Sequence, residues 1–97
     1  MTRTFYAALF ALPFAFSAAA STAYAYTGER LEAGAHVKMP AALAIALKAR
    51  PGAVTDRELE REGGGSGLRY SFDIRSHGVT YEVGVDALNG RVLENGP

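Results

Sequence analysis

The stretch Leu68–Asp86, LRYSFDIRSHGVTYEVGVD, determines the fold. Apolar and polar residues alternate over Leu68–Arg75 and again over Val79–Asp86, and Ser76–Gly78 between them form a short turn. Such alternation places the apolar residues on one face of a strand and the polar residues on the other. We therefore expect two antiparallel strands of one hairpin, with a single apolar face.

Weaker patterns on either side of this hairpin extend the sheet. Ala53–Glu62 is predicted as a polar strand, and Gly63–Gly67 as a flexible hairpin loop that joins it to Leu68. The loop lacks the Gly-Lys-Ser/Thr ending of a phosphate-binding loop, so we interpret it as a linker. Ala87–Gly90 is predicted as a second turn, and Arg91–Glu94 as a short last strand.

A single helix is expected before the strands. Pro40 suits a first helical turn, and Ala41–Arg50 consists mainly of the strong helix formers Ala and Leu. Pro51 ends the helix, because proline disfavours the helical conformation in the residue before it. Helical spacing puts four apolar residues on one face, namely Met39, Leu43, Ala46 and Leu47.

The apolar face of the sheet needs a cover, and this helix is the available one. The sequence therefore predicts an α+β domain, with one helix packed on an antiparallel meander of three to four strands. The expected core residues are Leu43, Ala46, Leu47, Leu59, Tyr70, Phe72, Ile74, Tyr81, Val83 and Val85. We expect the tyrosine hydroxyl groups at the rim of this core, where water satisfies them.

Residues 1–25 have the pattern of a cleavable signal peptide. Arg3 precedes the apolar run Phe5–Phe16, and Ala23–Ala25 provides the small residues of a cleavage site after Ala25. Ala18–Ala20 is a second candidate site, and an uncleaved anchor is the alternative. The run is shorter than the ~20 residues of a membrane span, so we expect export to the periplasm or the medium without stable membrane insertion.

The remaining chain divides into an extended or mobile lead-in, residues 26–36, and a folded domain, residues 37–97. The composition of the whole chain argues against several functions. The 10 basic and 10 acidic side chains balance, which disfavours nucleic-acid binding. The chain has no cysteine, and its two histidines, His36 and His77, lack the neighbours of a metal or catalytic site.

No set of residues has the pattern of an enzyme active site. Ser76 and His77 are adjacent in a turn, where a nucleophile and its base rarely face each other, and no third residue orients them. Three carboxylates lie at outward strand positions, namely Asp73, Glu82 and Asp86. We expect them to pair across strands with Arg69, Arg75 or Arg91 rather than to act as general acids or bases. We predict no cofactor, no metal and no catalysis.

Several segments together resemble the PepSY domain family. They are ALAIALKARPG over 42–52, ELERE over 58–62, the strand 70–75, YEV over 81–83 and VDALNGRVL over 85–93. Two positions depart from the family pattern. Lys38 stands where a capping Ser or Thr is common, and Arg57 where small or apolar residues are common.

The resemblance implies a non-enzymatic exported binding module that regulates or inhibits an extracytoplasmic peptidase. Strand addition at a sheet edge is the expected mechanism. Contacts would come from the first strand, through Arg57, Glu58, Glu60 and Arg61, or from the last, through Val92 and Leu93. The alternative is a small self-associating protein, a homodimer with a structural or sensory role in the envelope.

Overall fold

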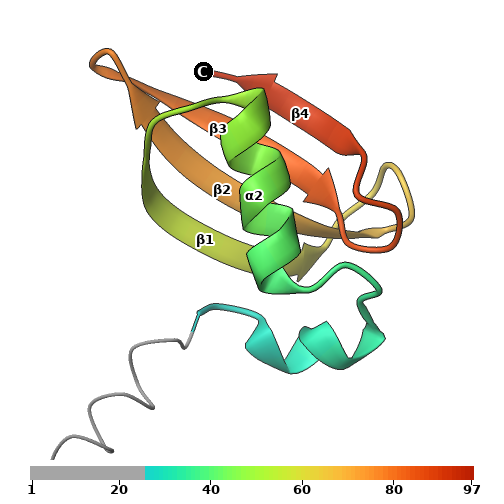
Figure 1. Cartoon of the computed structure of the whole chain (residues 1–97). Coiled ribbons are helices and arrows are strands. Elements are labelled where there is room, and N and C mark those ends of the chain that lie inside the picture. The colour runs from blue at the N-terminus through green and yellow to red at the C-terminus, as the bar shows by residue number, and fades with distance from the viewer. Residues whose placement is uncertain (1–25) are drawn as a thin grey trace, which may run out of the picture.

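The computed structural model describes residues 26–97, and the predicted signal peptide with Ala25 lies outside this range. Figure 1 shows a short helix, a longer helix and four strands in succession. Their bounds are η2 (Glu29–Gly34), α2 (Met39–Ala49), β1 (Ala53–Arg61), β2 (Leu68–Ser76), β3 (Val79–Asp86) and β4 (Val92–Gly96).

The four strands form one antiparallel meander in the order β1-β2-β3-β4, and α2 lies across one face of it (Figure 1). This arrangement confirms the predicted α+β fold. In the register of the central hairpin, Phe72 stands opposite Val83, and Tyr70 opposite Val85. The period-two pattern therefore assembles one continuous apolar surface beneath α2.

The core lies between α2 and the sheet. Of the ten predicted core residues, seven are buried, while Leu43, Leu47 and Tyr81 are half-buried at its margin. The cluster of buried apolar residues consists of Ala35, Met39, Ala42, Ala46, Leu59, Leu68, Tyr70, Phe72, Ile74, Val83, Val85 and Ala87. Arg50 covers the ring of Tyr81, with its guanidinium carbon 3.7 Å from the ring centroid.

The helix meets the sheet mainly through small residues. Met39 and Ala46 of the predicted face are buried, and Ala42, which the prediction left out, is buried with them. Ala42 and Ala46 have no exposed surface, while the larger Leu43 and Leu47 flank the contact. Ile45, which is not part of the predicted face, also packs against the core. Small side chains at the centre of the contact let the helix backbone approach the strands closely.

Lys38 and Tyr70 fix the start of α2. Lys38 is the N-cap residue without a side-chain cap; its Nζ instead donates hydrogen bonds to the carbonyl groups of Glu32 and Ala35, at 3.0 and 2.8 Å. The Tyr70 hydroxyl donates to the Val37 carbonyl at 2.7 Å. This protein contact corrects the expectation that water satisfies the hydroxyl, and burial raises the pKa of Tyr70 to about 12.

Residues 26–36 are not the extended or mobile lead-in that the sequence suggested. Glu29–Gly34 form the 3-10 helix η2, and Ala35 behind it is buried in the core. The amide groups of His36 and Val37 both donate to the Ala87 carbonyl at 2.9 Å. Long-range contacts of this kind leave no periodic pattern in the sequence, which is why the segment was misjudged.

Candidate functional site

The meander leaves β1 and β4 as its two edges, and the predicted contact residues lie on these strands. On β1, Arg57 and Arg61 are exposed, and Glu58 and Glu60 are half-buried. On β4, Val92 is exposed and Leu93 is half-buried. The two sets are thus on opposite edges, so one extended segment cannot pair with both.

The edge of β1 already pairs with another segment of the chain. Thr27 forms a parallel bridge with Glu58, and the Thr27 carbonyl accepts a hydrogen bond from the Leu59 amide at 2.9 Å. Gly28 follows with a φ of 86°, and a Cβ atom there would lie 1.8 Å from the Leu59 carbonyl oxygen. Glycine is therefore required for the chain to lie this close to β1.

This bridge shows which backbone groups face outward. The Leu59 amide points away from β2, and the backbone groups of a strand alternate in direction. The Arg57 amide, two residues earlier and past the irregularity at Val54/Asp56, therefore also faces outward. In the described part of the chain, Thr27 is the residue that bridges to this outer side.

The other edge, β4, is tied to the end of α2. The Nε atom of Arg50 donates to the Asn95 side-chain oxygen at 3.1 Å, and the Asn95 amide donates to the Ala49 carbonyl at 3.3 Å. These bonds hold β4 against the helix.

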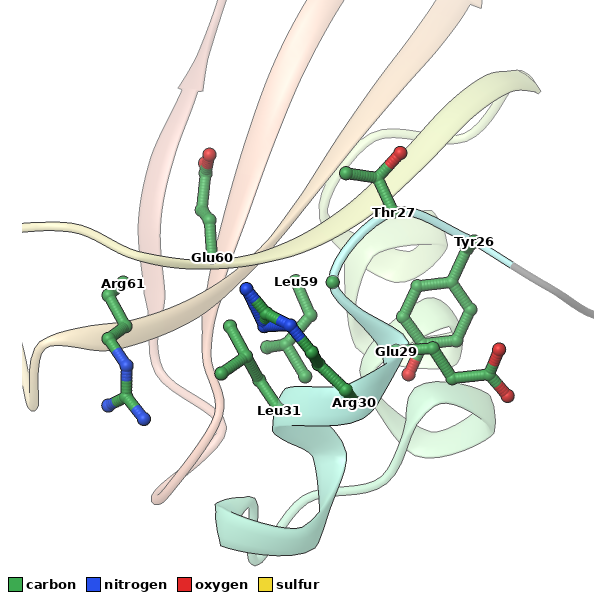
Figure 2. A pocket seen from close by; sticks show the side chains of 9 residues that line it. Tyr26, Thr27, Glu29, Arg30, Leu31, Leu59, Glu60 and Arg61 are labelled. Carbon is green, nitrogen blue, oxygen red and sulfur yellow. The ribbon is translucent and has the colours of Figure 1, made fainter.

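A groove lies between η2 and β1 (Figure 2), and we call it the η2 groove. One hollow of about 590 Å³ extends from Tyr26 to Arg61, and a second of about 370 Å³ extends from Arg30 to Leu88. Both are lined by Arg30, Leu31 and Arg61, so they adjoin. The Tyr26 hydroxyl donates to the Glu32 carboxylate, and burial followed by this bond raises the pKa of Tyr26.

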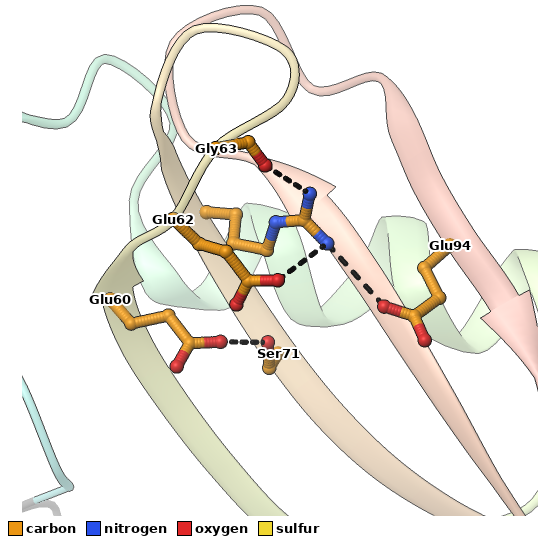
Figure 3. A network of polar contacts seen from close by, with 6 residues as sticks. Glu60, Glu62, Gly63, Ser71 and Glu94 are labelled. Atoms are coloured by element: carbon orange, nitrogen blue, oxygen red, sulfur yellow. Dashed lines mark hydrogen bonds and ion pairs between the residues drawn. The ribbon is translucent and has the colours of Figure 1, made fainter.

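The face of the sheet opposite α2 is polar and includes Arg69, the second residue of β2. Figure 3 shows Glu62, Gly63 and Glu94, the residues that contact this arginine. Arg69 is 7% exposed. Its Nη1 atom lies 3.4 Å from a Glu94 carboxylate oxygen and 3.9 Å from one of Glu62, and its Nη2 atom donates to the Gly63 carbonyl at 3.2 Å. Arg69 therefore links the β1–β2 loop to β4 across the polar face.

Acidic residues surround this arginine. Partial burial, followed by repulsion from Glu60 and Asp56, raises the pKa of Glu58. Partial burial, followed by repulsion from Glu94 and Asp73, raises the pKa of Glu82. The polar face of the sheet thus carries more negative charge than Arg69 offsets.

Asp86 is not an outward carboxylate on this face, as its strand position suggested, but a buried one. Its oxygens accept hydrogen bonds from the Ser66 amide, the Ser66 hydroxyl and the Leu88 amide, at 2.8, 2.6 and 2.8 Å. Burial alone would raise the pKa of Asp86, but these bonds and one from the Asn89 amide lower it to about 2. The glycine-rich loop is therefore anchored by this carboxylate.

The two histidines lie apart from one another. His36 is exposed beside the start of α2, and His77 is exposed in the β2–β3 turn, where its Nδ1 lies 3.2 Å from the Ser76 hydroxyl. Within residues 26–97 no carboxylate bonds to His77, and no group of three or more potential ligands is placed to hold a metal. The Ser76–His77 contact is a local bond within the turn.

Sequence reasoning missed the N-terminal residues that shape the β1 edge, namely Tyr26, Thr27, Gly28, Arg30 and Leu31. The Gly28 position and the pair of arginines at 30 and 61 were visible in the sequence. Only the folded chain shows that they meet at the same strand. The period-two pattern of β1 carries no information about its outer neighbour.

The comparisons with known proteins agree with this architecture. The family described as "Peptidase propeptide and YPEB domain", PepSY, matches residues 41–95. The chain belongs to this family, whose members are propeptide or inhibitor-like modules of extracytoplasmic proteins. No match is found among curated proteins or among solved structures. Between residues 26 and 97, no helix has the length and apolar character needed to cross a membrane.

Proposed function

We propose that this protein is a non-enzymatic, exported binding module that regulates or inhibits an extracytoplasmic peptidase by strand addition at β1. One observation carries the proposal: the outer side of β1 already pairs with the backbone of another residue of the chain, Thr27. A partner segment would use the same outward amide and carbonyl groups. It would displace Thr27 or pair beside it.

The family supports a peptidase as the partner. Domains of the PepSY family occur as propeptides and as inhibitor-like modules, which act on peptidases through binding rather than through chemistry. The proposed contacts on β1 are Arg57, Glu58, Glu60 and Arg61. Val92 and Leu93 on β4 form the second candidate edge, which is disfavoured because Asn95 ties this strand to α2.

Export is part of the same proposal. We propose that residues 1–25 direct the chain across the membrane and are removed after Ala25, so that the mature protein begins at Tyr26. Mass spectrometry of the exported protein tests this step. A first residue far from Tyr26 would contradict it, because the β1 edge would then carry a different N-terminal segment.

Two edge variants test the strand addition. Arg57→Pro removes the outward amide from β1, and proline is tolerated where an edge-strand amide faces solvent. Val92→Lys places a charge on β4 and serves as the matched control. We expect mature protein, immobilised through its C-terminus, to capture a co-exported peptidase and to inhibit it. Arg57→Pro should lose both activities, and Val92→Lys should keep them.

Three outcomes would contradict the proposal. If Val92→Lys rather than Arg57→Pro loses capture, the partner binds β4. If no co-exported peptidase is captured or inhibited, the peptidase function is wrong. If the protein instead forms a concentration-dependent dimer that unfolds when it dissociates, the self-associating alternative is favoured.

A further inference from the structure

The η2 groove carries positive charge that no acid within residues 26–97 neutralises. Neither Arg30 nor Arg61 forms an ion pair or a side-chain hydrogen bond in the described part of the chain. Two carboxylates lie nearby but point elsewhere: Figure 2 shows Glu60 and Glu29 directed away from the two guanidinium groups. Glu60 instead accepts a bond from the Ser71 hydroxyl at 2.6 Å.

The floor of the groove is apolar. Leu31 is half-buried between η2 and β1, and Leu59 beneath it is 1% exposed. Figure 2 shows Leu31 between Arg30 and Arg61. An arginine beside an apolar surface binds a carboxylate more strongly than one in open water, because the local dielectric is lower.

We propose that the η2 groove binds an acidic side chain, Glu or Asp, carried within an extended segment of a protein partner. The carboxylate would lie between Arg30 and Arg61, and the apolar neighbours of the acid would cover Leu31. The groove continues on both sides of these residues, toward Thr27 and toward Leu88, which fits a segment that passes through rather than one that ends there. This inference rests on the proposed function and specifies the partner's chemistry.

The η2 groove adjoins the edge of β1 that is proposed to pair with the partner. Leu59, Glu60 and Arg61 of β1 line the groove, and Thr27 lies at its other end. A segment paired with the outer side of β1 would therefore place alternate side chains over the groove. The acidic residue would then select among segments that all offer the same backbone bonds.

Two peptide probes test the inference by NMR titration of the mature protein. The probes are N-acetyl-Leu-Glu-Leu-amide and its Gln counterpart, which differ only in the charge of the central residue. We expect the Glu probe to shift the Nε–Hε signals of Arg30 and Arg61 in a saturable manner. Binding of the Gln probe should be about two- to fivefold weaker, since an exposed arginine–carboxylate pair contributes modestly.

Three arginine variants test whether the two groove arginines bind the Glu probe. Arg30→Gln and Arg61→Gln should each weaken binding of the Glu probe about two- to fivefold, and added salt should reduce the difference between the probes. Arg91→Gln is the matched control, because Arg91 is exposed in the β3–β4 connection and does not line the groove. Circular dichroism checks that each variant is folded.

The inference is overturned if the Glu and Gln probes bind equally, if neither probe shifts the groove signals, or if both groove variants bind like the wild type. None of these results removes strand addition at β1. That proposal is decided separately, by peptidase capture with Arg57→Pro, which leaves Arg30 and Arg61 in place. If the wild type captures no peptidase, or if Arg57→Pro captures it like the wild type, strand addition at β1 is wrong even where the Glu probe still binds the groove.

Discussion

At the scale of single residues, Asp86 connects two loops that are distant in sequence. Its carboxylate accepts bonds from Ser66 in the β1–β2 loop and from Leu88 in the β3–β4 turn. Hydrogen bonds to a charged acceptor are stronger than those to a neutral one. The pKa of Asp86, lowered from its ordinary 3.8 to about 2, reflects this preference for the charged form.

We predict that Asp86→Asn lowers the free energy of unfolding by about 2 kcal/mol at pH 7, because charge-assisted bonds are lost. A carboxyl whose pKa is lower in the folded state stabilises the fold at pH values above its ordinary pKa. That stabilisation disappears as the pH falls from about 4 to about 2. Urea unfolding at several pH values should show the difference between wild type and variant shrinking over this range.

Asp73→Asn provides the control, since Asp73 lies on the polar face without contacts to either loop. Its unfolding curve should shift much less than that of Asp86→Asn. Equal pH dependence of the wild type and Asp86→Asn would show that Asp86 does not bear the charge assigned to it.

Glu82 has the opposite effect on stability. Partial burial and the nearby Glu94 and Asp73 raise its pKa, so the ionised form is disfavoured in the folded state. We predict that Glu82→Gln raises the Tm by about 1–3 °C at pH 7, as expected for an exposed charge. The gain should vanish at acidic pH, where Glu82 is protonated, and should shrink in salt.

Thermal unfolding followed by circular dichroism measures this change. Glu29→Gln, which removes an exposed carboxylate from η2, is the comparison. If both substitutions change the Tm equally, overall charge rather than the local acidic surroundings is responsible.

At the scale of elements, α2 depends on its alanines. Ala42 has no exposed surface and lies where the helix meets the sheet, whereas Ala44 on the same helix is exposed. We predict that Ala42→Leu costs about 1–3 kcal/mol of unfolding free energy, because it overpacks a filled core. Ala44→Leu should change it by less than about 0.5 kcal/mol. Chemical denaturation that ranks the two variants otherwise would contradict the packing described here.

Residues 26–28 are expected to protect the edge of β1 from solvent. In Gly28→Ala the new Cβ atom meets the Leu59 carbonyl, and the positive φ adds strain. We expect the Thr27 bridge to open and the Leu59 amide to exchange with solvent at least about tenfold faster, the equivalent of roughly 1.4 kcal/mol of lost protection. Hydrogen exchange followed by NMR measures the exchange rate of the Leu59 amide.

Gly34→Ala is the matched control, because no atom lies within 4 Å of a Cβ there. The Phe72 amide, in the central strand β2, should exchange at the wild-type rate in both variants. Unchanged exchange at Leu59 in Gly28→Ala would mean that the N-terminal segment does not protect the edge of β1.

The elements differ in how far the sequence could predict them. Alternation over β2 and β3 determines strand, register and buried face together, since a slip of one residue would expose every apolar side chain. Propensity predicts the helix, and Met39 and Ala46 of the predicted face are buried. Periodicity did not single out the buried Ala42, because every residue from Ala41 to Leu47 is apolar. η2 and the Thr27 bridge depend on contacts with β1, which no local pattern encodes.

At the scale of the whole molecule, the two sides of β1 differ in charge. The η2 groove offers Arg30 and Arg61, while the polar face offers Glu58 and the acids around Arg69. A partner that pairs with β1 would meet both sides at once. Acidic side chains would suit the groove, and basic ones the polar face.

Removing residues 26–34 should leave a folded meander whose β1 edge is open. We predict that this shortened chain keeps its β signal in circular dichroism and associates at high concentration, since an unpaired edge invites pairing with a second copy. Light scattering at increasing concentration measures the association. Arg57→Pro in the shortened chain should restore the monomer, and a chain that stays monomeric without it would contradict the protective role of the segment.

The position of Thr27 on β1 also governs how the protein should be handled. A tag or fusion domain attached directly before Tyr26 would emerge beside the strand that is proposed to receive the peptidase, and its bulk could mask binding that the native chain supports. Attachment after Pro97 places the fusion beyond β4, on the opposite border of the sheet. Negative capture results from N-terminal fusions therefore carry little weight.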